Sequence, residues 1–283
     1  VGLGTSTGTN YLNDFWQFDQ NTGTWTQKAN FGGGGRYAAA AFTIGSKGYV
    51  ATGVAAGSTY PQAFYEYDAT ANTWTAKANF PGTGRSGASA FAMGTKGYVS
   101  CGNNGSNYFT DLWEYNQTTD SWTQKTNFPG IARSYASSFN VGTKGYLGCG
   151  YVGATATDTS DFFEYDPSTN VWTQKTNFPE GSSSGTIGFS IGGNGYLCAG
   201  TANAFNNHLW QYQSLNDTWT LCAGFSGGGR AYSVGMGIGN KGYVGLGYSQ
   251  GIGINLNDWW EYTPIGVTSV PVIYGPSVAC TLN

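Results

Sequence analysis

The segment DFFEYDPSTNVWTQK, residues 161–175, is the clearest of several similar segments in this chain of 283 residues. It joins an alternating aromatic run, a polar turn, and a Trp followed by Thr-x-Lys. That Trp recurs in the same setting five times, with steps of 49, 48, 50 and 47 residues, and a Gly-Tyr pair recurs with the same mean step. Two markers with one period indicate internal repeats of about four dozen residues.

Each repeat contains four runs with the composition of β-strands. A small apolar run comes first (38–44, 88–93 and 136–141), the Gly-Tyr run second (as in 97–102), the aromatic run third, and the run that starts at Trp fourth. One four-stranded meander cannot bury both of its faces, but radially stacked sheets cover one another. The sequence therefore predicts an all-β fold: a six-bladed β-propeller of four-stranded antiparallel blades.

The repeat also resembles a known family. An Asp-x-x-x-Tyr-Asp-x-x-Thr-x-x-Trp pattern, an Arg before a small apolar run, and Gly-Tyr-Val/Leu-x-x-Gly closely resemble kelch repeats. The best copy runs through Asp161, Glu164, Tyr165, Asp166, Thr169 and Trp172. One departure is the single Gly that closes the second run, where kelch repeats usually have a Gly pair. It is seen at Gly53, Gly102, Gly150 and Gly200.

The number of copies sets the number of blades and the place of the two chain ends. The aromatic run occurs six times, and residues 1–4 look like the end of a sixth Gly-Tyr run. We expect a propeller domain over residues 1–264 and a tail, 265–283, that completes the last blade and closes the ring. The tail would supply a fourth strand within 267–274 and an inner strand from 277–282. Seven blades, with an upstream piece lost, is the alternative.

Composition excludes some partners and favours a location. Only 10% of residues are charged, the net charge is −3, and no basic patch is visible, so we expect no nucleic-acid partner. No stretch of 18 or more predominantly apolar residues is present, so we expect no membrane span. Scarce Lys and Glu with abundant Asn, Thr, Gly and Tyr resemble secreted or cell-surface bacterial repeat proteins, which predicts an extracellular or cell-surface location.

The five cysteines are an odd number without CxxC spacing. Cys101 and Cys149 share one repeat position and are interpreted as small buried hydrophobic residues. The sequence leaves open whether Cys222 and Cys280 form a disulfide.

The charge inventory argues against catalysis. All 12 Lys and Arg and 13 of the 15 acidic residues occupy recurring repeat positions, and the exceptions are Asp158 and Glu180. The single histidine, His208, replaces the Asp of other copies and is interpreted as a hydrogen-bonding side chain at a loop end. Kelch-type copper oxidases need two histidine ligands, and a zinc site needs three or four N/S ligands. We therefore expect no cofactor, no metal and no catalytic residue.

Loops on one face of the predicted propeller vary, whereas those on the other are nearly constant. Variable loops on a rigid scaffold commonly carry recognition. The predicted ligand-binding residues in them are Tyr60, Asn104, Tyr108, Tyr151, Phe205, Asn207 and Tyr248.

Four arginines precede the inner strands and are predicted to surround the channel mouth on that face: Arg36, Arg85, Arg133 and Arg230. The kelch resemblance implies contact with an acidic peptide at this position. The fourth copy has Ser183 and Ser184 instead. The alternative is that the arginines are tied to carboxylates or carbonyls of neighbouring blades.

The sequence thus predicts a non-catalytic binding or scaffold module that recognises a protein or a glycan through its loop-rich face. One alternative is a glycan-active enzyme of the sialidase or epimerase kind. The other is a structural subunit of a surface assembly whose blades pack edge to edge.

Overall fold

The computed structural model describes residues 1–6, 10–202, 205–222 and 224–264. The chain forms two compact units. Unit 1 contains residues 1–134, 152–155 and 166–172, and unit 2 contains the remainder. Within the described ranges, no helix is long and apolar enough to cross a membrane.

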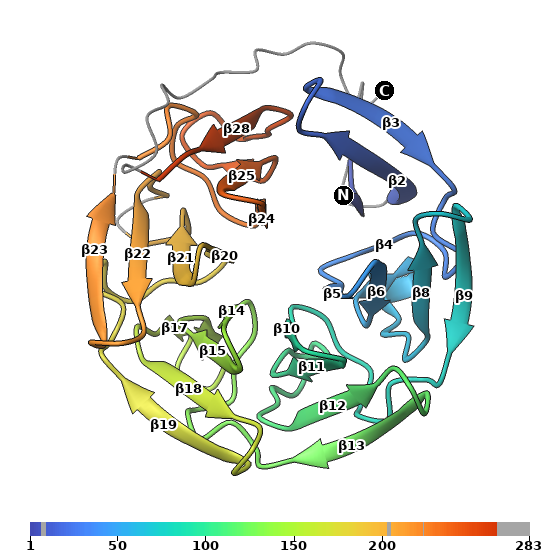
Figure 1. Cartoon of the computed structure of the whole chain (residues 1–283), viewed down its shortest axis with the longest axis horizontal. Coiled ribbons are helices and arrows are strands. Elements are labelled where there is room, and N and C mark those ends of the chain that lie inside the picture. Colours follow the sequence, from blue (N-terminus) through green and yellow to red (C-terminus); the bar gives the residue numbers. More distant parts are fainter. Residues whose placement is uncertain (7–9, 203–204, 223, 265–283) are drawn as a thin grey trace. The chain divides into compact units, whose positions relative to one another are not determined.

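Antiparallel sheets make up almost all of the regular structure (Figure 1). The first three have the orders β1-β2-β3, β5-β6-β8-β9 and β10-β11-β12-β13. Their strands are β1 Gly2–Thr5, β2 Tyr11–Asp19, β3 Thr24–Lys28, β5 Ala40–Ile44, β6 Lys47–Ala51, β8 Phe64–Asp68, β9 Thr73–Lys77, β10 Ser89–Met93, β11 Lys96–Ser100, β12 Leu112–Asn116 and β13 Ser121–Lys125. A short pair, β4 Arg36–Tyr37 with β7 Val54–Ala55, and a single 3-10 turn, η1 Ala56–Ser58, lie in the connections.

Three further sheets have the orders β14-β15-β18-β19, β20-β21-β22-β23 and β24-β25-β28. Their strands are β14 Ser137–Val141, β15 Lys144–Gly148, β18 Phe162–Asp166, β19 Val171–Lys175, β20 Ile187–Ile191, β21 Asn194–Cys198, β22 Leu209–Gln213, β23 Thr218–Cys222, β24 Val234–Ile238, β25 Lys241–Gly245 and β28 Trp259–Tyr262. Two short hairpins in the loops pair β16 Tyr151–Val152 with β17 Thr157–Asp158, and β26 Tyr248–Ser249 with β27 Ile254–Asn255.

The six sheets confirm the predicted all-β architecture and its four-stranded blade. The first sheet lacks an innermost strand and the last lacks an outermost one among the described residues, as expected for a chain that starts part-way through a repeat. The strands and ring closure predicted for 265–283 lie outside the described residues, as does Cys280. The innermost strands begin later than expected, at Ala40, Ser89 and Ser137, because the residue two places earlier has a positive φ.

Aromatic side chains from adjacent blades fill the space between sheets. In unit 1, strands β5 and β10 lie side by side (Figure 1). The Phe64 ring of one sheet meets Tyr115 and Trp122 of the next edge-on, at centroid distances of 4.6 and 4.9 Å. Phe64 and Tyr115 are fully buried. Such edge-to-face pairs favour one fixed arrangement of neighbouring sheets.

The repeated Trp and the turn before it join one blade to the previous one. Trp122 donates from Nε1 to the Ala78 carbonyl at 2.9 Å. Asp120, in the left-handed conformation with φ 48°, accepts from the Ala78 amide at 3.0 Å and from the Tyr115 hydroxyl at 2.8 Å. Asn and Asp tolerate this conformation better than most residues, which explains their place two residues before Trp.

The single closing glycine is explained by the residue before it. Cys101 (φ 62°) and Gly102 (φ 94°) both have positive φ, and the Gly102 amide donates to the Arg133 carbonyl of the next repeat at 2.8 Å. A non-glycine residue thus has the left-handed conformation directly before the closing glycine. Cys101 and Cys149 are fully buried, which confirms their interpretation as small core residues, and burial raises the pKa of Cys101 to about 11.

Candidate functional site

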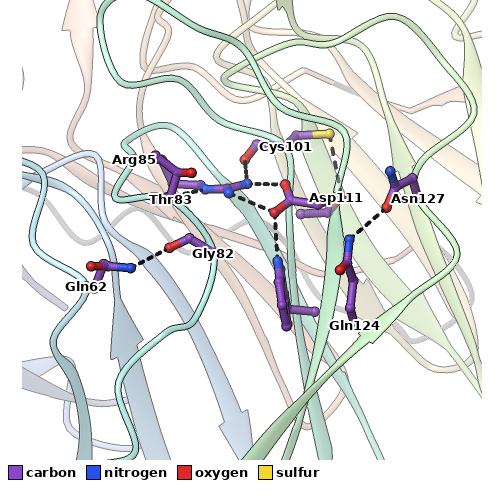
Figure 2. Close-up of polar contacts among 10 residues, drawn as sticks. Gln62, Gly82, Thr83, Arg85, Cys101, Asp111, Gln124 and Asn127 are labelled. Atoms are coloured by element: carbon purple, nitrogen blue, oxygen red, sulfur yellow. Dashed lines mark hydrogen bonds and ion pairs between the residues drawn. The ribbon is translucent and has the colours of Figure 1, made fainter.

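Arg85 forms a buried unit with the start of the third strand in its own blade (Figure 2). The side chain is fully buried. Its Nη1 donates to Asp111 Oδ1 and to the Cys101 carbonyl at 3.0 Å, its Nη2 to Asp111 Oδ2 at 2.8 Å, and its Nε to the Thr83 carbonyl at 2.8 Å. Trp113 Nε1 donates to the same carboxylate at 2.7 Å. This Arg is therefore held by a bidentate ion pair and two carbonyls.

Arg230 repeats this arrangement in unit 2. Its Nη1 and Nη2 donate to Asp258 Oδ1 and Oδ2 at 2.5 and 2.6 Å, and Nη1 also donates to the Leu246 carbonyl at 3.1 Å. Arg133 is fully buried as well, with Nε donating to the Ile131 carbonyl at 2.8 Å and the guanidinium 4.8 Å from the Phe128 ring centroid.

The predicted role of the four arginines at an accessible channel mouth therefore needs correction. Arg36 is 1% exposed, and the other three side chains are fully buried. Their donors are directed to carbonyls, and in Arg85 and Arg230 also to carboxylates, which is the alternative that the sequence left open. A guanidinium with this degree of burial cannot bind an acidic peptide without rearrangement of the blade.

The fifth sheet has different residues at both positions of this unit. Ser183 replaces the arginine, and His208 replaces the aspartate. Glu180 supplies the carboxylate from the other side of the loop, with Oε1 2.9 Å from His208 Nδ1 and Oε2 accepting from Trp210 Nε1 at 2.5 Å. His208 is thus a hydrogen-bonding side chain at a loop end, as predicted. One of the two acidic residues outside the repeat pattern is also explained.

The Asp258 carboxylate should make the last blade sensitive to acid. Burial raises the pKa of Asp258. Hydrogen bonds from Arg230 and Trp260 lower this pKa by more than burial raises it, so the net pKa lies below the ordinary value of 3.8. Because the folded pKa is below the unfolded one, this stabilisation is present above the unfolded value and is lost as pH falls through the folded value.

We therefore expect Asp258→Asn to lower the free energy of unfolding near neutral pH and to flatten its fall below about pH 4. Urea unfolding at a series of pH values measures both effects. If the free energy of unfolding falls equally with pH in the two proteins over the acid range, Asp258 is not the source of the acid sensitivity.

The predicted loop residues have different surroundings. Asn104 Oδ1 accepts from the amides of Ser106 and Asn107 at 3.2 and 2.8 Å, and Asn207 Nδ2 donates to the Phe225 carbonyl at 2.7 Å, so both amides shape their own loops. Among the tyrosines, Tyr248 is exposed, and three are half-buried: Tyr60, Tyr108 and Tyr151. Phe205 and Tyr248 form an edge-to-face pair with centroids 6.2 Å apart.

Two tyrosines that sequence reasoning did not select lie together in unit 2. Tyr135 and Tyr232 each come two residues after a buried arginine, and their rings meet edge-on at 5.2 Å. Gly185 lies between them along the backbone, because its amide donates to the Tyr135 carbonyl at 3.1 Å and its carbonyl accepts from the Tyr232 amide at 3.0 Å. A Cβ on Gly185 would meet the Tyr232 ring at 2.9 Å, so the glycine leaves room for the rings.

Both tyrosines have a backbone conformation that is unfavourable for a bulky residue. Their φ angles are 53° and 57°, and the same repeat position holds Ala38, Gly87 and Gly185 in other copies, with φ between 51° and 60°. A bulky residue at this φ is an outlier, and such strain often marks functional positions. The available sequence signal was Tyr where other copies have Ala or Gly, but it is visible only once the backbone is known.

Polar groups border the tyrosine pair. Asp158, the second acidic residue outside the repeat pattern, accepts from Thr201 Oγ1 at 2.5 Å, and Thr201 Oγ1 accepts from the Ser184 amide at 2.8 Å. Burial raises the pKa of Tyr232, the Asp158 carboxylate raises it further, and a hydrogen bond with Ser184 lowers it. The Tyr232 phenol therefore stays protonated at neutral pH and can donate.

The Phe205–Tyr248 pair lies beside this cluster. Tyr248 pairs with Ala231, the neighbour of Tyr232, through backbone hydrogen bonds of 3.0 and 2.9 Å. The Tyr232 side chain is 49% exposed and that of Tyr248 is 37% exposed. We define the tyrosine cluster as Tyr135, Asp158, Ser184, Thr201 and Tyr232, with Phe205 and Tyr248 as its aromatic neighbours. It offers aromatic faces, hydroxyl groups and one carboxylate.

In the part of the chain that the structure describes, no group of three or more His, Cys, Asp or Glu side chains could hold a metal ion.

Comparison with known proteins shows the fold. No family model and no curated protein matches the chain. A solved structure described as "Structure of YjhT" is similar, with a TM-score of 0.74 and 19% identity, and the match covers 89% of each chain. At this identity the likeness concerns architecture alone, and together with the six antiparallel sheets it shows that this chain has the fold of a six-bladed β-propeller.

Proposed function

We propose that this protein is a non-catalytic binding module that recognises a carbohydrate through the tyrosine cluster of unit 2. The observation that carries the proposal is the pair of partly exposed tyrosines in left-handed backbone conformation. Aromatic faces suit the apolar faces of sugar rings, and hydroxyl and carboxylate groups suit their hydroxyls. The kelch-type repeat and an extracellular location belong to the same proposal, on the basis of motif and composition.

Backbone strain supports a role in binding rather than in folding. A residue held in an unfavourable φ/ψ region costs about 1–3 kcal/mol. Glycine would remove this cost, as it does at Gly87 and Gly185. Tyr232 also leaves 49% of its surface exposed, so burial compensates only in part. The two tyrosine side chains therefore lower the stability of the fold, and contact with a ligand would account for their presence.

Charge supports a neutral or basic sugar over an acidic one. Arg133 and Arg230, which each precede one of the two tyrosines by two residues, are fully buried, whereas the cluster contains the Asp158 carboxylate. A carboxylate repels an acidic sugar and accepts hydrogen bonds from sugar hydroxyl or amino groups. The proposal therefore disfavours sialic acids and uronic acids as ligands.

The proposal is tested by Tyr232→Gly, which introduces the residue found at this position in other repeats. We expect the melting temperature to change little or to rise, because glycine tolerates positive φ. Affinity for the oligosaccharide selected on a glycan array should fall by about tenfold or more, which corresponds to about 1.4 kcal/mol of lost contact. Calorimetric titration of the oligosaccharide measures the affinity.

Ala38→Gly is the matched control, because Ala38 occupies the same repeat position in unit 1 with φ 51°. It should leave glycan affinity unchanged. Unchanged affinity in Tyr232→Gly would contradict the site. Release of a modified sugar by the wild-type protein would contradict the non-catalytic part of the proposal.

A further inference from the structure

Arg36 differs from Arg85 and Arg230 in having no carboxylate partner among the described residues. In the other two blades, the residue directly before the third strand is Asp111 or Asp258. In the Arg36 blade this residue is Ala63, directly before Phe64. The charge is nevertheless buried, since Arg36 is only 1% exposed. Burial lowers the pKa of Arg36, which reflects an environment unfavourable to the cation.

Ala63 has the same backbone position as Asp111. The residue before each of them accepts the same hydrogen bond from a Phe amide, Gln62 from Phe80 at 2.9 Å and Thr110 from Phe128 at 2.7 Å. The next residue pairs with a Lys in the fourth strand in both blades. The two loops therefore present residues 63 and 111 equivalently. The Arg36 blade has a methyl group where the next blade has a carboxylate, and Tyr65 where the next blade has Trp113.

The Arg36 guanidinium also has unused donors. Nη1 donates to the Thr52 carbonyl at 3.0 Å and Nη2 to the Gly33 carbonyl at 2.5 Å. Nε is buried and has no hydrogen-bond partner. Arg85, in contrast, makes four hydrogen bonds, including one from Nε. A buried charge without a counter-ion and with an orphaned donor is unfavourable, so an acceptor of negative charge would stabilise it.

We propose that Arg36 and Ala63 form a binding site for a small carboxylate anion, which takes the place that the Asp111 carboxylate has in the next blade. A carboxylate matches the planar fork of a guanidinium better than a spherical ion does. Ala63 is partly exposed, which gives the anion a route from solvent. All residues of this site belong to unit 1, and the site is independent of the tyrosine cluster.

Formate is the sharpest probe, because an alanine side chain plus a carboxylate group is an aspartate side chain. Thermal unfolding is measured while sodium formate replaces sodium chloride at constant sodium concentration. We expect a saturable rise in the melting temperature of the wild-type protein of about 2–4 °C, the shift that corresponds to about 1 kcal/mol in a domain of this size.

Ala63→Asp is the matched variant, because it supplies the carboxylate covalently. It should melt above the wild type without formate and lose the formate response. Arg36→Met should lose the formate response as well. It keeps the test possible if Ala63→Asp does not fold. Equal formate responses in all three proteins would reveal a general salt effect and overturn the site. The absence of a rise in the wild-type protein when formate replaces chloride would overturn the site too.

Discussion

Replacing Arg85 with methionine is expected to lower the free energy of unfolding by about 3–5 kcal/mol. Arg85 is fully buried, and its removal leaves the Asp111 carboxylate, whose side chain is 19% exposed, without its cation. The Thr83 and Cys101 carbonyls lose their donors at the same time. A stranded buried charge costs more than the pair contributes, so the single substitution should be severe. Urea unfolding measures the change.

The double variant Arg85→Met/Asp111→Leu separates the cost of a stranded charge from the loss of packing. It should be more stable than Arg85→Met alone, because no charge is then left unpaired. Lys96→Met is the surface control in the same blade, since Lys96 is 31% exposed and lies 3.6 Å from Glu114. That pair should contribute less than about 1 kcal/mol. A loss for Arg85→Met no larger than the control would place Arg85 at an accessible surface after all.

Repeat spacing and the composition of the runs together predicted the strands, because each repeat position has one structural task. Trp122 and Asp120 show why: the indole and the turn carboxylate both bond the previous blade, so their spacing follows from blade geometry. The start of the innermost strand was predicted too early. Ala38 belongs to the small apolar run that predicted the strand, but the Gly87 amide of the next blade donates to its carbonyl, and Ala38 has a left-handed conformation.

Burial of the arginines could have been inferred from how residues vary between repeats. Arg85 and Arg230 are each followed by an aspartate before the third strand, and where Ser183 replaces the arginine, His208 replaces the aspartate. That joint change indicates direct pairing, and the Arg36 blade, with Ala63 at the aspartate position, is the exception. The repeat position predicted only that the arginines precede the inner strands. Their burial depends on how the loops fold over the side chains.

The tyrosine cluster could not be predicted, since its members come from separate loops. Asp158 was recognised as an unexplained charge, but its proximity to Tyr232 follows from the Thr201 and Ser184 contacts between two repeats. Phe205 and Tyr248 were predicted as binding residues in separate loops, and the structure brings their rings together. Asn104 and Asn207 were also predicted as binding residues in the loops, yet their side-chain amides form hydrogen bonds within the loops. Composition cannot distinguish an amide that binds a ligand from one that holds a loop.

The glycine of the Gly-Tyr marker is expected to be nearly irreplaceable, and Gly97→Ala is the strongest test. A Cβ at Gly97 would overlap the ring of Phe42 from the neighbouring blade. That ring is 7% exposed and stacks on Tyr49 at 5.2 Å, so it has no free space to move into. The same overlap arises between Gly195 and Phe139 and between Gly242 and Phe189 in unit 2. At these three positions the marker glycine therefore leaves a gap that accepts an aromatic ring of the adjacent sheet, whereas a Cβ at Gly48 would meet only the Tyr67 Cβ, at 3.8 Å.

Overpacking of this kind costs about 1–3 kcal/mol and sometimes more, and we expect Gly97→Ala to lie at the upper end because both partners are buried. Phe42→Leu removes part of the ring, so Gly97→Ala should cost less in that background, with a coupling of about 0.5–3 kcal/mol in a double-mutant cycle. Urea unfolding of the four proteins provides the cycle. Additive losses would mean that Gly97 is needed for its backbone rather than for the space beside Phe42, and the repeat would then be fixed within each blade instead of by contact between blades.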